Sequence, residues 1–170
     1  MKTILTLFAL VAILLDGALY AQYSPEEAVF MERWQRLQND FDAGRLELNA
    51  QGLPVEHDTQ TSKASEQGLF NVTINSQRQP LPFNQLHDWS VRVITPDGEP
   101  VIGAELQFFG GMPLHNHGFP TVPKVTGEPE PGTYALEGIK FSMSGWWQLA
   151  FGIAAGEKKD IVSFNLVLEP

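Results

Sequence analysis

From residue 69 to the C-terminus, apolar and polar side chains alternate in short runs that are separated by turn residues. In the last run, Val162, Phe164, Leu166 and Leu168 alternate strictly with their neighbours. A period of two residues is typical of β-strands that bury one face in a core. The pattern predicts seven strands, over residues 69–75, 87–95, 102–109, 121–126, 133–141, 146–154 and 161–168.

The segments between these runs carry strong turn signals. TPDGEP at 95–100, GEPEPG at 127–132 and AAGEKKD at 154–160 combine glycine with proline or charged residues, as loops between adjacent strands do. Seven short strands at this spacing are typical of a β-sandwich. The sequence therefore predicts a mostly β fold, an immunoglobulin-like β-sandwich, over residues 68–170.

The segment before the sandwich reads differently. Within residues 22–48, a helix is predicted from Ser24 to Asp42, because Ser24 suits an N-cap and Pro25 suits the first helical position. Phe30, Trp34, Leu37 and Phe41 form one apolar stripe on this helix. Residues 49–67 are polar and aperiodic and are predicted to be a linker.

The first 21 residues have the pattern of a secretory signal peptide. A lysine precedes an apolar run over residues 4–15, which is short for a membrane span, and cleavage after Ala21 is expected. Retention of this segment as a membrane anchor is the alternative. The chain has no cysteine, so the fold is expected to hold without disulfides.

Charge and motifs exclude several classes of function. A net charge of −9 is unsuited to nucleic acid or anionic lipid. We find no nucleophile elbow, no HExxH motif and no phosphate-binding glycine loop, so the sequence predicts no enzyme and identifies no small-molecule substrate.

The loop GGMPLHNHGFPT, residues 110–121, concentrates possible metal ligands. It holds Met112, His115 and His117, and in an extended segment the two histidines would share a face. Thioether and imidazole ligands together favour copper. His87 or Met143 would complete such a site. The alternative is a glycine- and proline-rich loop whose histidines bind backbone groups and no metal.

The run HDWSVRVITPDGEPVIGAELQFFGGMPLHNHGFPTVPKVT, followed by GTYALEGIKFSMSGWWQLAFGI, resembles the YtkA-like domain, which is related to FixH-type proteins of bacterial envelopes. The resemblance covers residues 69–168. It implies an extracytoplasmic immunoglobulin-like sandwich and a periplasmic or secreted location, and it associates the chain with copper handling and respiratory-enzyme assembly.

Two functional hypotheses follow. In the first, the exported protein binds a transition metal, most plausibly copper, through the Met/His loop. In the second, it is a metal-free module that binds an envelope protein, through the loop rim or through the exposed helix side that carries Arg33 and Arg36.

Overall fold

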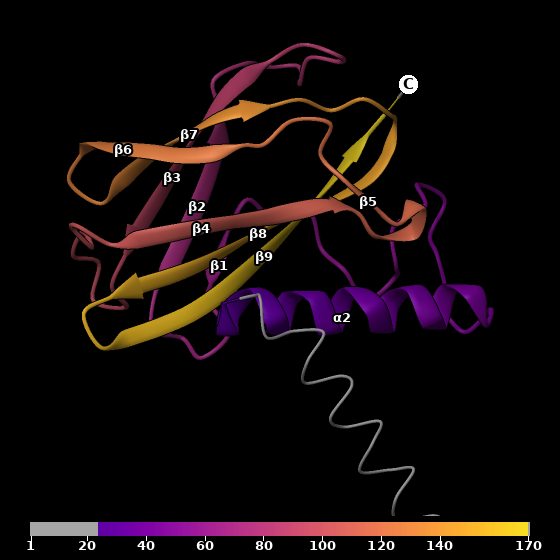
Figure 1. Ribbon diagram of the computed structural model, residues 1–170, viewed down its shortest axis with the longest axis horizontal. Helices are drawn as coiled ribbons and strands as arrows, with labels where there is room; N and C mark the ends of the chain where they lie inside the picture. The colour runs from indigo at the N-terminus through magenta and orange to yellow at the C-terminus, as the bar shows by residue number, and fades with distance from the viewer. Residues whose placement is uncertain (1–23, 170) are drawn as a thin grey trace, which may run out of the picture.

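The computed structural model describes residues 24–169 and shows two β-sheets with one long helix beside them (Figure 1). The predicted signal peptide, residues 1–21, lies outside the described residues. In chain order the elements are α2 (Pro25–Asp42), β1 (Ser62–Ala64), β2 (Asn71–Ser76), β3 (His87–Ile94), β4 (Glu105–Met112), the 3₁₀ turn η1 (Pro113–His115), β5 (His117–Gly118), β6 (Lys124–Glu130), β7 (Thr133–Ile139), β8 (Gly145–Ala155) and β9 (Lys158–Leu168).

The strands form an antiparallel sandwich. One sheet has the order β1-β2-β3-β7-β6 and the other has the order β5-β4-β8-β9. Between them lies one continuous core that includes Val91 from β3, Leu136 from β7 and Trp147, Phe151 and Phe164 from the β8–β9 pair. The predicted immunoglobulin-like β-sandwich is confirmed. Six of the seven predicted runs contain most of one strand, whereas the run over residues 121–126 covers only the start of β6. The described part of the chain adds the short strands β1 and β5.

Strand β8 is buried without alternation from Trp146 to Ile153, because α2 covers the outer face of its sheet. On that face Phe30 and Trp34 of the helix pack against Ala150 and Ile161. The observed helix has the predicted bounds. Ser24 caps it by accepting a hydrogen bond from the backbone N–H of Glu27 at 3.1 Å, which satisfies a donor that the first turn leaves free.

Residues 49–67 are more closely joined to the sandwich than the linker prediction implies. β1 pairs with β2, and Ser65 and Asp160 are both buried. The Asp160 carboxylate accepts hydrogen bonds from the Ser65 hydroxyl at 2.5 Å and from the backbone N–H groups of Gln67 and Leu69. The polar composition that indicated a linker serves here to hold a loop on the end of β9.

Candidate functional site

The Met/His loop lies where β4 turns back into β5. Pro113 begins the 3₁₀ turn, and Asn116 ends it in the left-handed conformation, with φ 52° and ψ 43°, which asparagine tolerates better than most residues. At Gly111 an added Cβ would lie 2.3 Å from the His117 carbonyl oxygen and 2.9 Å from Trp34. Glycine therefore allows the loop to approach both β5 and the helix.

His115 and His117 stand on either side of Asn116, with ring centroids 6.0 Å apart. His115 is exposed and His117 is half-buried. With metal–nitrogen bonds of about 2.1 Å, two imidazoles on opposite sides of one ion have centroids roughly 6 Å apart. The spacing of the pair is therefore compatible with a single ion between them.

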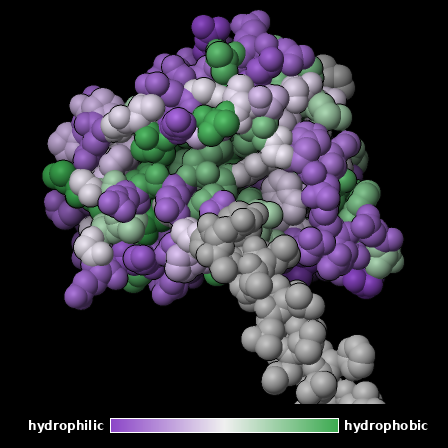
Figure 2. Space-filling view, viewed as in Figure 1, coloured by the Kyte–Doolittle hydropathy of each residue, from purple (hydrophilic) through white to green (hydrophobic). Residues whose placement is uncertain are grey.

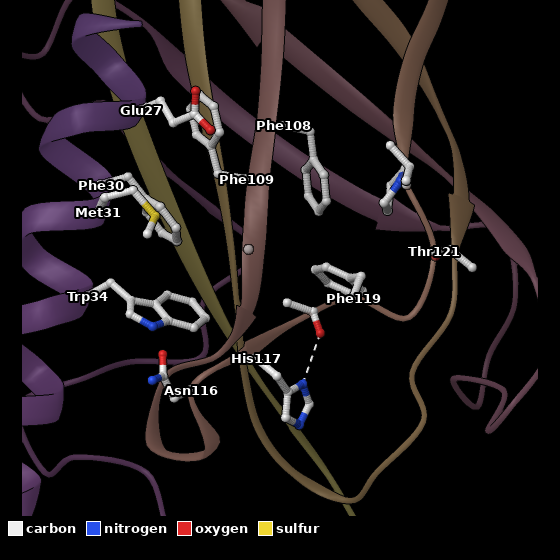
Figure 3. Close-up of a pocket in the computed structure, with 14 residues that line it drawn as sticks. Glu27, Phe30, Met31, Trp34, Phe108, Phe109, Asn116, His117, Phe119 and Thr121 are labelled. Carbon is white, nitrogen blue, oxygen red and sulfur yellow. Dashed lines mark hydrogen bonds between the residues drawn. The ribbon is translucent and has the colours of Figure 1, made fainter. Parts of the chain in front are cut away.

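Figure 3 shows a hydrogen bond at the His117 ring, whose Nδ1 lies 2.9 Å from the Gly118 carbonyl oxygen. A carbonyl can only accept, so in this arrangement Nδ1 carries the proton and donates it. Nε2 then keeps its lone pair free for a metal.

Met112 is brought close to this pair but is covered. It faces His117 across the β4–β5 pair, so both side chains lie on the same face. Its side chain is fully buried and lies in the core next to Gly145. The sequence held a signal for this, because Met112 is in phase with the inward-facing Leu106 and Phe108 of β4.

Met143 is accessible, with 40% of its surface exposed. Its carbonyl oxygen accepts a hydrogen bond from Trp147 Nε1 at 3.0 Å. The same indole also packs against His117, with ring centroids 5.9 Å apart. Met143 and His117 therefore both border Trp147.

His87 is not part of the pair. It is buried in β3, in phase with Trp89, and its ring packs against Phe141 at 5.4 Å between centroids. Phe141 and Trp147 separate it from His117. Burial lowers the pKa of His87, and Arg78 lowers it further. Within residues 24–169, its Nε2 has no hydrogen-bond partner.

The described residues contain no group of three or more His, Asp or Glu side chains that could hold a metal ion. The arrangement therefore offers two imidazoles from the loop, and the backbone of the exposed Met143 contacts Trp147, which His117 also borders. It leaves coordination positions open to solvent or to an acceptor molecule.

A groove of about 470 Å³ adjoins the loop, between α2 and residues 116–123 (Figure 3). Its lining is largely aromatic, and the loop contributes Asn116 and His117 to it. This groove was not predicted from the sequence. The apolar stripe of the helix indicated an apolar surface, and Phe30 and Trp34 of this stripe line the groove, whereas Phe41 is exposed.

A model of the YtkA-like family matches residues 64–151, more than half of the chain. The chain belongs to the YtkA-like family. The match includes β2 to β7, the Met/His loop and most of β8, so the loop and Trp147 lie inside the YtkA-like domain and α2 lies outside it.

Three solved structures are similar to this YtkA-like protein at low identity, each with a TM-score below 0.5. A DUF4426 family protein from Pseudomonas aeruginosa PAO1 has 17% identity and a TM-score of 0.47, over 65% of this chain and 96% of that one. The ZirS C-terminal domain has 14% identity and a TM-score of 0.36, over 65% and 72%. A copper-bound variant of FetP from uropathogenic Escherichia coli strain F11 has 10% identity and a TM-score of 0.37, over 66% and 96%.

None of these three likenesses supports a functional assignment. Among curated proteins, none matches the sequence. Within the described part of the YtkA-like protein, no helix is both long enough and apolar enough to span a membrane.

Proposed function

We propose that this YtkA-like protein binds one copper ion through His115 and His117, as an exported protein that handles copper for the envelope. The observation that carries the proposal is the accessible imidazole pair, whose centroids lie 6.0 Å apart. The hydrogen bond from His117 to Gly118 supports it, because it leaves Nε2 available as a ligand.

A thioether ligand beside the imidazole pair would favour copper over other ions that imidazole accepts. Imidazole ligands alone suit zinc, copper, iron and nickel, whereas an added thioether selects Cu(I). Met143 has the exposure for this role, and Met112 is enclosed in the core. We assign the thioether to Met143 for this reason. An incompletely filled coordination sphere suits binding and transfer rather than catalysis.

Competitive titration with Cu(I) against a chelator of known affinity tests the proposal. The wild-type protein should bind one equivalent, and the His115→Ala, His117→Ala double variant should bind about 100-fold more weakly or worse. His57→Ala is the matched control, because it removes an imidazole that packs against Trp146, away from the loop. Circular dichroism of all three proteins checks that the fold is kept.

The proposal fails if the wild-type protein does not bind Cu(I). It also fails if the double variant and His57→Ala bind alike. Parallel titrations with Cu(II) and Zn(II) determine whether the ion is copper.

A metal-free interaction role is the second candidate function, and the groove favours it. The alternative surface on the helix is less open, because Arg33 forms an ion pair with Glu66 and Arg36 lies 3.5 Å from Glu32. The loop rim instead borders an unfilled apolar groove.

A further inference from the structure

The groove wraps around the edge of strand β4. Phe108 and Phe109 both line it, although consecutive residues of a strand point to opposite faces of a sheet. A cavity can touch both only where it passes the strand's edge. Figure 3 shows the two rings on opposite sides of the β4 ribbon, with Phe30 and Trp34 on one side and Phe119 on the other.

The backbone at this edge is unpaired. β4 pairs with β8 along residues 105–111, whereas β5 pairs only with Gly111 and Met112. In the described part of the chain, no strand pairs with residues 105–110 on the open side. In an antiparallel sheet, every second residue of such a segment turns its N–H and C=O away from its partner. The groove floor therefore offers hydrogen-bonding groups in strand spacing.

Within residues 105–110, the edge also lacks the side chains that commonly block strand addition. Proteins commonly shield open edges with lysine, proline or inward-pointing charges, but residues 105–110 read ELQFFG, with one charge at the start. The rim is apolar as well at Val122, which is 79% exposed. Exposed apolar side chains beside a hollow are typical of an interaction surface. Figure 2 shows apolar side chains gathered in the middle of this face, above the helix.

One carboxylate lines the groove, that of Glu27 on the first turn of α2. Among the described residues Glu27 forms no ion pair, in contrast to its neighbour Glu26, which lies 4.0 Å from Lys159. The protein as a whole carries a net charge of −9. A basic side chain in the occupant would complement both the local and the overall charge.

We propose that the groove binds an extended segment of a partner protein, which adds to the sheet as a strand along residues 105–110 of β4. This is β-strand addition, in which backbone hydrogen bonds supply affinity and alternate side chains enter flanking pockets. Six residues of strand span about 20 Å. Alternate side chains of the segment face Phe108 and Phe119 on one side and Phe30 and Phe109 on the other, with apolar groups on one of these faces, and a lysine or arginine reaches Glu27. This proposal rests on the second candidate function, the interaction role, and names the kind of partner that it requires. It does not rest on copper binding.

The experiment uses a synthetic nonapeptide, Lys-Thr-Val-Thr-Phe-Thr-Val-Thr-Lys, titrated into the isotope-labelled protein and followed by NMR. Amide resonances of residues 105–110 and 117–119 should shift, and the amides of the β4 edge should exchange more slowly with solvent. Two further peptides carry N-methyl groups on every second backbone nitrogen, one at the odd-numbered and one at the even-numbered residues. Only one of these two sets of N–H groups faces β4, so one of the two peptides should bind at least about tenfold more weakly. Replacing both terminal lysines with glutamate should also weaken it.

Two pairs of variants locate the site. Val122→Lys should weaken the peptide at least about tenfold by placing a charge at the apolar rim, whereas Val55→Lys, at a 51% exposed valine elsewhere, should not. Glu27→Lys should reverse the preference between lysine and glutamate peptides. Glu47→Lys is the matched control for total charge, because Glu47 lies beyond the C-terminal end of α2 and Glu27 lies in its first turn.

Each contrary outcome overturns the proposal. If the peptide does not bind, there is no strand-addition site. If both N-methylated peptides bind as well as the unmodified one, the groove is an apolar pocket that makes no backbone hydrogen bonds to its ligand. Self-association in analytical ultracentrifugation that is lost in Val122→Lys assigns the edge to a second copy of this chain. Failure here leaves the copper titration unaffected, and failure of that titration leaves this result unaffected.

Discussion

Gln38 of α2 donates a hydrogen bond from Nε2 to the carbonyl oxygen of Pro113 at 2.7 Å. This contact joins the helix to the turn that carries His115, and Trp34 lies against Gly111 one helical turn earlier. The helix lies outside the matched region of the family, yet it supports the loop that holds the candidate ligands.

Replacing Gln38 with alanine should loosen the turn. The loss of one partly buried hydrogen bond should cost about 1 kcal/mol of unfolding free energy, and amides 114–118 should exchange faster in hydrogen–deuterium exchange. Gln35→Ala is the matched control, because Gln35 bonds only to Asn39 on the helix surface. Equal exchange in the two variants would show that the contact does not order the loop.

The two methionines near the site should respond differently to leucine. Met112→Leu should change Cu(I) affinity little and stability by less than about 1.5 kcal/mol, since it is a size-conserving change in the core. Met143→Leu should lower the affinity for Cu(I) and leave the stability unchanged, because Met143 is exposed. Chelator competition and urea unfolding measure both quantities. Loss of affinity in Met112→Leu alone would transfer the thioether role to Met112.

Asp160 should be one of the most sensitive positions for stability. Its carboxylate accepts from the Ser65 hydroxyl and from the backbone N–H of Gln67, Leu69 and Ile161. Asp160→Ala leaves these donors without their acceptor and should cost roughly 2–4 kcal/mol. Ser65→Ala removes one of these bonds and also the hydroxyl that accepts from the Phe70 backbone N–H at 3.0 Å, and should cost about 1–2 kcal/mol. Urea unfolding should rank the two in this order, and similar small losses would refute it.

Acid should destabilise the fold partly through His87. Burial lowers its folded-state pKa below the ordinary 6.5, so the unfolded chain binds a proton more readily than the folded one. This contribution to stability is fully present above pH 6.5 and is lost as pH falls from 6.5 through the lower folded-state pKa. Urea unfolding at pH 7.5 and pH 5 measures the loss.

The variant His87→Phe should show a smaller loss than wild type between these two pH values. Part of the dependence should persist, because burial also lowers the pKa of His57. Val55→Ala, at an exposed valine that does not titrate, is the control and should keep the wild-type dependence. A loss in His87→Phe as large as that of wild type would exclude His87 as a source.

The sequence predicted the features that short-range signals determine. Ser24 and Pro25 indicated where the helix begins. The alternation of apolar and polar residues indicated the long strands. β1 and β5 escaped prediction because two or three residues carry no periodicity, and only pairing with β2 or β4 makes them strands.

The same distinction holds for the candidate site. His115 and His117 are close because they are close in sequence. The other features depend on how the sheets and the helix pack. This packing buries Met112, separates His87 from the imidazole pair and brings Gln38 to the carbonyl oxygen of Pro113. The sequence predicted a strand that ended at residue 109, so it left Met112 in the loop, whereas β4 continues to Met112 and places it on the inward face. The inward positions of Met112 and of His87 in β3 weigh against a ligand role for both.

Gly111 has a consequence for how relatives can be compared. A side chain there would meet His117, Gly118 and Trp34 at once, so a homologue with a larger residue must shift both the returning strand and the helix. A relative's residue at this position therefore predicts whether its helix sits against the loop as here. Genome sequences can be sorted by this single position before any further structure is determined.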